Sequence, residues 1–165
     1  MDECDSERVG GVEIRTWLTD ASIDDFEPFG VFGSHRDGAV LIFQGRVRET
    51  NEGRAVRRVD YEAYGEMAER ELKTICREAA VAFEVGAIYA AHRVGRLGLG
   101  EVSVAIGVSA PHRDRCYEAS RFVIEQIKSR LPIWKHEHYV DGASDWVGSP
   151  SGGTPTTTDA ESEDS

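Results

Sequence analysis

The stretch VRRVDYEAYGEMAERELKTICREAAVAFE, residues 56–84, changes its hydrophobic period in the middle. Over residues 56–63 apolar and charged side chains alternate, which predicts a strand with one wet face that pairs antiparallel with the strand before it. Over residues 64–84 apolar side chains recur every three or four positions, which predicts an amphipathic helix of about five turns. We therefore expect a strand that continues directly into a helix near residue 64.

The run GAVLIFQGRV at residues 38–47 is too short for a helix and rich in strand-forming residues. Such an apolar run predicts a strand buried on both faces, so we expect it at the centre of a sheet. Further strands are predicted over residues 12–18, 87–94 and 101–109.

A second helix is predicted over residues 111–130, where apolar residues recur at helical spacing and Pro132 prevents continuation. Residues 133–147 form a short polar and aromatic closing segment. The order of these elements indicates an α+β fold with a mainly antiparallel sheet and two long amphipathic helices.

One domain is expected over residues 11–148. Residues 1–10 are acidic and we expect them to be flexible. Residues 149–165 contain Ser, Thr, Gly, Pro and acidic residues with no large apolar side chain. Because such a segment cannot offset the entropy of ordering, we expect a disordered tail.

Charge is the most distinctive feature of the composition. The chain of 165 residues has 30 Asp and Glu against 19 Lys and Arg, a net charge of −11. This balance argues against a general nucleic-acid or membrane-surface binder, because polyanions are repelled. The lysines number only three: Lys73, Lys128 and Lys135. High acid content with so little lysine is expected of a protein from a halophilic source.

The compartment follows from two further observations. The first twenty residues contain no apolar stretch typical of a signal peptide, and the longest apolar runs are too short to span a bilayer. We therefore expect a cytoplasmic protein. Cys76 and Cys116 fall at apolar helical positions, so buried free thiols are expected.

Two segments have the chemistry of an anion site. Arg46 and Arg48 follow the apolar strand on one face, and the planar guanidinium suits phosphate. His112 and Arg113 lie where a strand gives way to a helix, whose N-terminus favours an anion. Surface arginines that balance an acidic protein are the alternative for the first segment.

Two of the three lysines, Lys128 and Lys135, lie seven residues apart. Lysine can act as acid, base or nucleophile when partly buried, whereas arginine cannot. In a chain that uses arginine almost everywhere else, this pair indicates a catalytic site more than two incidental surface residues.

A metal site is not predicted. His112, His136 and His138 are the candidate ligands, but the His-x-His pair is a weak signal and no Cys or carboxylate lies at a recognised ligand spacing. No cofactor site is predicted either.

Five blocks of the sequence resemble, in this order, the catalytic large subunit of molybdopterin synthase: GAVLIFQGRVR at 38–48, YEAYGEMAE at 61–69, HRVGRLGLGE at 92–101, VSAPHR at 108–113 and LPIWKHE at 131–137. The resemblance implies a hammerhead-like α+β fold and a homodimer. It also implies a small ubiquitin-like sulfur-carrier subunit at each end, which gives a heterotetramer. The carrier's C-terminal Gly-Gly, as a thiocarboxylate, would give sulfur to cyclic pyranopterin monophosphate and so form molybdopterin.

The resemblance also implies site residues. The family's lysines match Lys128 and Lys135 as catalytic and substrate-binding residues. The other implied substrate-binding residues are Arg46, Val47, Arg48, His112, Arg113, His136 and Glu137. Position 136 is a histidine where the family often has arginine. The expected clamp on the substrate's phosphate consists of Arg48, His112 and Arg113.

Two other functions remain open from the sequence. One is a non-catalytic dimeric scaffold that docks the ubiquitin-like carrier, against which the presence of both lysines argues. The other is a phosphate- or nucleotide-binding regulator without a carrier partner.

Overall fold

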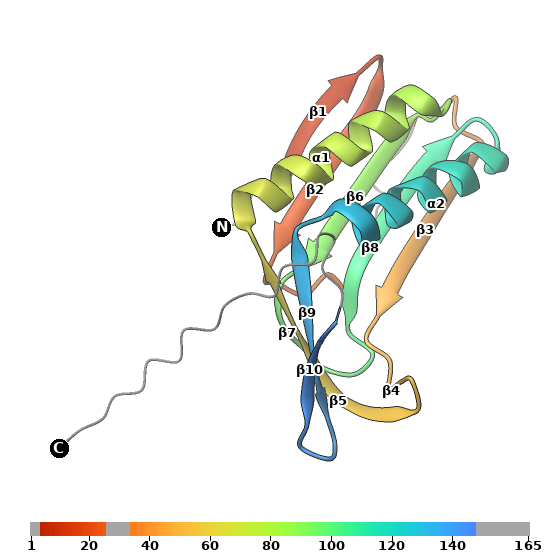
Figure 1. The fold of residues 1–165 in the computed structure, drawn as a ribbon. Helices are drawn as coiled ribbons and strands as arrows, with labels where there is room; N and C mark the ends of the chain where they lie inside the picture. Colours follow the sequence, from red (N-terminus) through yellow and green to blue (C-terminus); the bar gives the residue numbers. More distant parts are fainter. Residues whose placement is uncertain (1–3, 26–33, 148–165) are drawn as a thin grey trace.

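The computed structural model describes residues 4–25 and 34–147. Within them the chain forms two sheets and two long helices (Figure 1). The first sheet has the strand order β1–β2–β6–β8–β3, with bounds Asp5–Val9, Val12–Thr19, Ala87–Arg93, Val102–Ala110 and Ala39–Arg46. Its neighbouring strands are antiparallel except β2 and β6, which are parallel.

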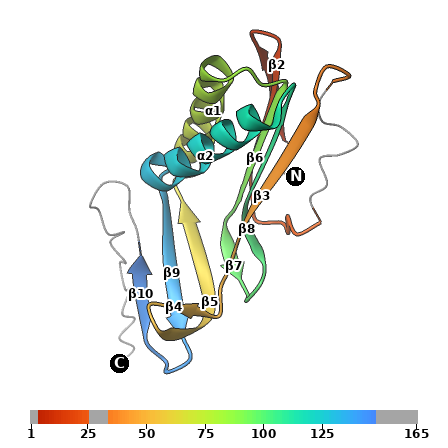
Figure 2. The ribbon, with the colours of Figure 1, turned by 90° about the vertical axis from the view of Figure 1, so that its right-hand side faces the viewer.

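The second sheet has the order β10–β9–β5–β4, and a short strand, β7, also pairs with β5. The bounds are Ser144–Val147, Ile133–Tyr139, Arg54–Ala63 and Thr50–Asn51, with Gly95–Leu97 for β7. Figure 2 shows this sheet extending past one end of the helices, so the molecule has a helix-covered part and a sheet-only part.

Helices α1 (Gly65–Ala82) and α2 (Arg113–Arg130) cover one face of the first sheet (Figure 2). Their buried stripes pack against β2, β6 and β8 in the main core, to which they contribute Ala68, Leu72, Ile75, Cys76, Ala79, Cys116, Ala119, Val123 and Ile127. Both predicted helices and the three strands predicted over 12–18, 87–94 and 101–109 are confirmed to within about two residues, the usual spread of element boundaries.

The N-terminal segment differs from the prediction of a flexible stretch over residues 1–10. Asp5–Val9 form β1, which pairs with β2 through a turn at Gly10 and Gly11. Both glycines have positive φ, 57° and 87°, a conformation that costs glycine little. The acidic composition of the segment gave no indication of this hairpin turn.

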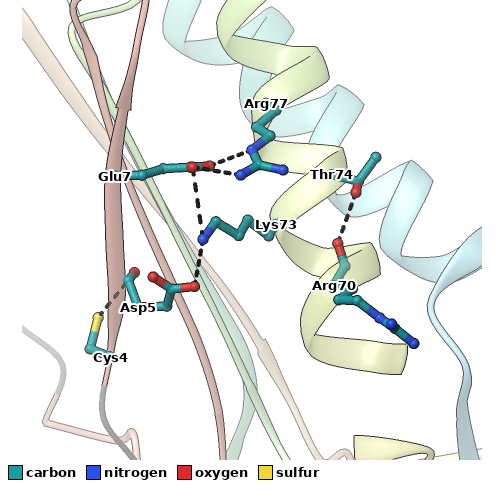
Figure 3. A network of polar contacts seen from close by, with 7 residues as sticks. All are labelled: Cys4, Asp5, Glu7, Arg70, Lys73, Thr74 and Arg77. Carbon is teal, nitrogen blue, oxygen red and sulfur yellow. Dashed lines mark hydrogen bonds and ion pairs between the residues drawn. The ribbon is translucent and has the colours of Figure 1, made fainter. Parts of the chain in front are cut away.

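Ion pairs hold β1 against α1, as Figure 3 shows. Arg77 donates Nε and Nη2 to the two carboxylate oxygens of Glu7 at 2.5 and 2.6 Å. Lys73 Nζ lies 2.6 Å from Asp5 Oδ2. The acidic residues that suggested a loose segment therefore meet the cationic face of α1.

Strand β3 is not central. It is an edge strand, paired on one side with β8, and Val40 and Phe43 are 43% and 36% exposed. The prediction of a central strand was therefore wrong. An apolar run indicates that both faces of a strand are apolar, but it does not say whether the same chain covers them.

The strand predicted over 56–63 exists as part of β5, but it does not pair with β3. It pairs with β9, and the hairpin partner on its other side is the two-residue β4. The segment 133–147, which carried no strand prediction, forms β9 and β10. The expected tail from 149 lies outside the described residues.

The observed architecture confirms the α+β class with mainly antiparallel sheets. Neither of the two long helices in the described ranges is apolar enough to cross a membrane.

Candidate active site

A pocket of about 330 Å³ lies where the C-terminal end of α2 meets the ends of β3 and β9. Its charged lining residues are Arg46, Lys128 and Lys135, and no Asp or Glu lines it within the described part of the chain. In a chain of net charge −11 this pocket is therefore locally cationic, which suits an anionic ligand.

Arg46 is placed by an irregularity at the end of β3. The register against β8 shifts between Gly45 and Arg46. A Cβ on Gly45 would lie 2.6 Å from Val104 Cγ1, so the close approach of the two strands requires glycine. Arg46 donates Nη1 to the carbonyl of Gly100 at 3.2 Å and Nη2 to Gln44 Oε1 at 2.8 Å. The guanidinium is thereby fixed at the pocket.

The two lysines reach the pocket from different elements. Lys128 is an exposed residue in the last turn of α2, and Ile124, one turn earlier, lines the same pocket. The helix ends before Pro132 and the chain turns into β9, which carries Lys135. This turn brings two cations seven residues apart to one cavity, as the sequence spacing suggested.

Lys135 is held by a buried carboxylate. Its Nζ forms an ion pair with Glu137 Oε1, and Glu137 is only 1% exposed. Asn51 and Tyr139 donate to Glu137 Oε2 at 2.8 and 2.9 Å. Burial raises the pKa of the Glu137 carboxyl, but hydrogen bonds from Lys135, Tyr139 and Asn51 outweigh it, so the pKa is lowered overall. Glu137 therefore stays ionised and orients Lys135.

Arg48 joins this network from the segment after β3. Its Nη2 donates to Asn51 Oδ1 at 3.4 Å, which links it to Glu137 through one side chain. Arg48 lines a smaller cavity of about 30 Å³ that shares Arg46 and Lys135 with the main pocket. Val47 is 6% exposed and belongs to a small core cluster, so its side chain has a packing role.

His92 and Tyr61 line the pocket and were not predicted as site residues. Their rings meet edge to face at 5.3 Å, and His92 Nδ1 lies 2.9 Å from the carbonyl oxygen of Arg93. Burial lowers the pKa of His92 to about 4, so the ring is neutral at pH 7. The block HRVGRLGLGE contains His92, but nothing in its spacing marks a pocket residue.

His112 and Arg113 do not reach this pocket within one chain. His112 precedes the first residue of α2, Arg113, and both are exposed. Lys128 lies fifteen residues further along the same helix, which at 1.5 Å per residue is about 22 Å away. The expected clamp of Arg48, His112 and Arg113 is therefore not assembled by a single copy.

His136 also departs from the expected arrangement. It follows Lys135 on β9, and successive side chains of a strand point to opposite faces. Its ring stacks on Trp146 at 4.3 Å and lies 4.3 Å from the ring of His138. Asp60 of β5 joins these two histidines to form the one group of potential metal ligands found in residues 4–25 and 34–147. Sequence spacing missed Asp60 because it comes from another strand.

A second cavity, of about 360 Å³, lies between the β1–β2 hairpin and α1. It mixes acidic and basic lining residues, among them the Asp5–Lys73 pair of Figure 3, and none of the expected site residues lines it. Its three basic residues, Arg70, Lys73 and Arg77, are offset by two acidic ones, Asp5 and Glu69, and Lys73 and Arg77 are already paired with carboxylates of β1.

Two sheets, a helical layer over one of them and a cationic pocket with two lysines define an α+β protein equipped to bind and act on an anionic substrate. The family model for the MoaE protein matches residues 18–130. The chain belongs to the MoaE protein family.

Individual relatives agree with this membership. The molybdopterin synthase catalytic subunit of Halalkalibacterium halodurans is 46% identical over 111 residues, 67% of this chain and 70% of that protein. The crystal structure of molybdopterin synthase from Staphylococcus aureus is similar with a TM-score of 0.73 and 36% identity, covering 80% of this chain and 96% of that one. A Helicobacter pylori molybdopterin-converting factor chain shares the fold at a TM-score of 0.55 and 19% identity, over 76% of this chain and 80% of that one. The chain is thus similar to enzymes of the molybdopterin synthase type.

Proposed function

We propose that this chain is the catalytic subunit that converts cyclic pyranopterin monophosphate to molybdopterin in molybdenum cofactor biosynthesis, and that the pocket between α2, β3 and β9 is the reaction site. The observation that carries the site assignment is that Lys128 and Lys135, two of three lysines in the chain, line one cavity with Arg46. A cyclic phosphate and a thiocarboxylate are both anions, and these three cations supply the complementary charge.

The two lysines have different surroundings, which supports a division of roles. Lys128 is exposed at the rim, where the C-terminus of a carrier protein arrives from solvent. Lys135 is part-buried and fixed by its ion pair with Glu137. A fixed position suits a group that transfers a proton to or from a bound substrate. We assign Lys128 to the carrier terminus and Lys135 to acid–base chemistry at the substrate.

A homodimer accounts for His112 and Arg113. Ala39 of β3 pairs with Ala110, so the start of α2 lies near one end of β3, and Arg46 at the pocket marks the other end. If two β3 edges meet antiparallel across a two-fold axis, the opposite ends of the strands come together. Each pocket then receives His112 and Arg113 from the partner copy, and the exposed Val40 and Phe43 are covered.

The sulfur is proposed to arrive on a small ubiquitin-like carrier subunit with a C-terminal Gly-Gly thiocarboxylate. The Helicobacter pylori protein of the same fold is described as a protein–protein complex of subunits 1 and 2 of molybdopterin-converting factor, a precedent for such an assembly on this fold. The two buried thiols are poorly suited to react, because burial raises the pKa of Cys76 to about 12 and also raises that of Cys116. No cofactor is proposed for the sulfur-transfer reaction.

Separate Lys128→Ala and Lys135→Ala variants test this function with pre-thiocarboxylated carrier and the pterin precursor. We expect each to slow dithiolene formation by about 100-fold or more, because Lys135→Ala removes an acid–base group and Lys128→Ala removes the group that engages the carrier terminus. Lys73→Ala is the matched control, because Lys73 pairs with Asp5 and Glu7 outside the pocket, and it should keep normal turnover.

Near-normal turnover in both pocket variants would contradict the proposal. The alternative, a non-catalytic dimeric scaffold, predicts that the unmodified chain binds carrier but forms no dithiolene at all.

We also propose that the acidic, lysine-poor composition is an adaptation to concentrated salt, and that the protein acts in the cytoplasm. The excess of 30 acidic over 19 basic residues supports the first proposal. The cytoplasmic proposal rests on the similarity to molybdopterin synthase catalytic subunits.

A further inference from the structure

The face of β9 opposite Lys135 and Glu137 carries a separate cluster of side chains. In the register of the second sheet Asp60 of β5 lies directly across from His136. His138 is two residues further along β9 and so shares the face of His136. Asp60 and His138 touch, with His138 Nε2 at 2.7 Å from Asp60 Oδ2.

The geometry of these three side chains fits a transition-metal cation. One ligand atom from each, two imidazole nitrogens and a carboxylate oxygen, lie within 4.8 Å of one another. Around tetrahedral Zn²⁺, bond lengths near 2.1 Å place neighbouring ligand atoms about 3.4 Å apart, so modest side-chain rotations suffice. All three residues are part-buried, which leaves room for a water as fourth ligand.

Asp60 has an oxygen whose bonding is incomplete. Its Oδ1 is buried and has no hydrogen-bond partner within the described residues, and its ion pair with Arg96 Nε is long, at 3.6 Å. A carboxylate with an oxygen that accepts no hydrogen bond, beside two imidazoles, is a donor set suited to zinc.

Two features of the surroundings have opposite effects on the affinity for a metal cation. The stacking of His136 on Trp146 at 4.3 Å, with an interplanar angle of 11°, fixes that ring before a metal binds. Arg58 Nη2 lies 3.4 Å from both Asp60 Oδ2 and His138 Nε2, so its charge opposes a cation. Removal of Arg58 should therefore raise the affinity for zinc, whereas removal of a ligand should lower it.

We propose that Asp60, His136 and His138 form a Zn²⁺ site that joins β5 to β9 behind the wall of the pocket. Zinc replaces the proton shared between His138 and Asp60, and that proton leaves to solvent. The metal contributes structural rigidity to the strand that carries Lys135, and the site is separate from the lysine pocket.

The experiment uses the full chain without an affinity tag, in a Cys4→Ser background because Cys4 is an exposed thiol. After removal of metal with a chelator, Zn²⁺ affinity is measured by competition with a chromophoric chelator, and Co²⁺ absorption reports the coordination geometry. We expect one Zn²⁺ per chain and tetrahedral Co²⁺ bands. Asp60→Asn and His138→Ala should each weaken binding by about 100-fold, at least the loss seen for outer-shell partners.

His35→Ala is the control, because His35 is exposed on another part of the chain, and its affinity should be unchanged. Arg58→Gln should bind zinc more tightly than the parent. The proposal is overturned if the parent chain binds no stoichiometric zinc, or if Asp60→Asn and His138→Ala bind it like the parent. If His138→Ala does not fold, as judged by circular dichroism, the proposal is judged on the other two variants. Zinc affinity should then fall in Asp60→Asn and rise in Arg58→Gln.

Discussion

Glu137 shows how one buried residue organises the cationic pocket. Its carboxylate forms an ion pair with Lys135 and accepts hydrogen bonds from Asn51 and Tyr139. Asn51 also accepts a hydrogen bond from Arg48, which links Arg48 to the same network. A buried charge is stable only when it is paired and hydrogen-bonded, and here the pairing fixes a lysine at the pocket. The stabilisation of the fold and the positioning of the site therefore rest on the same contacts.

His92 gives a prediction on pH and stability. Its pKa is about 4 in the folded chain against 6.5 for the unperturbed group, so the unfolded chain takes up the proton first as pH falls. The stability that depends on neutral His92 is complete above pH 6.5 and is lost progressively toward pH 4. At about pH 5 the loss amounts to about 2 kcal/mol.

The measurement is urea unfolding of the parent and of His92→Gln, which has no titrating group at this position. The difference in unfolding free energy between the two should shift by about 2 kcal/mol in favour of the variant between pH 7.5 and about pH 5. A difference that does not depend on pH would contradict the buried neutral state of His92.

At the scale of elements, periodicity predicted both helices and most of the longer strands, but not which strands pair. The switch from period 2 to period 3.6 near Tyr64 is local, and β5 and α1 follow it. The pairing of β5 with β9 joins segments about 75 residues apart in the chain, and no local pattern encodes it. β9 was not predicted either, because its polar and aromatic sequence does not mark a strand and its strand conformation depends on pairing with the distant β5.

The edge position of β3 leads to a prediction about assembly. Val40→Lys adds a charge to each copy at the proposed dimer interface, so the dimer dissociation constant should rise at least about tenfold, because like charges there are costly. Analytical ultracentrifugation measures it, with circular dichroism as the check on folding.

Val81→Lys is the matched control, since Val81 is an equally apolar and even more exposed residue, at 79%, on α1. It should leave the association state unchanged. An unaltered dimer in Val40→Lys would place the interface elsewhere than on β3.

At the scale of the whole molecule, the shared pocket can be tested by mixing inactive variants. Lys128→Ala and Arg113→Ala homodimers should each be nearly inactive. After subunit exchange, half of the dimers are mixed, and each mixed dimer contains one site with both residues intact. Activity should therefore recover to about a quarter of the unmodified level. Sites built within one chain predict no recovery, because every copy then lacks a residue.

The acidic surface gives a prediction on salt. Self-repulsion among carboxylates is screened at high ionic strength, so the unfolding midpoint at pH 7 should rise by about 5 °C between about 0.1 M and 2 M KCl. Differential scanning calorimetry measures this. At about pH 4, where many carboxylates are protonated, the rise should be smaller. A midpoint at pH 7 that falls with KCl would argue against adaptation to salt.

Part of the candidate site was predictable from the residues. Lys128 and Lys135 were expected because lysine is rare in this sequence, and Arg46 and Arg48 because they follow an apolar strand; Glu137 was expected only from the family resemblance. All five lie at one pocket and the small cavity beside it. The pocket walls, such as His92, carry no such signal, since an isolated histidine in a strand does not indicate a cavity.

The sequence by itself determined both helices, the strands over 12–18, 87–94 and 101–109, the α+β class and the lysine pair, because these depend on periodicity and composition within short segments. Only the tertiary structure decided that β3 is an edge, that His112 and Arg113 lie a helix length from the pocket, and that Asp60 meets His136 and His138. These facts depend on strand pairing between distant segments. Which strands pair is decided by how side chains from distant segments pack and become buried together, so the local sequence does not record it.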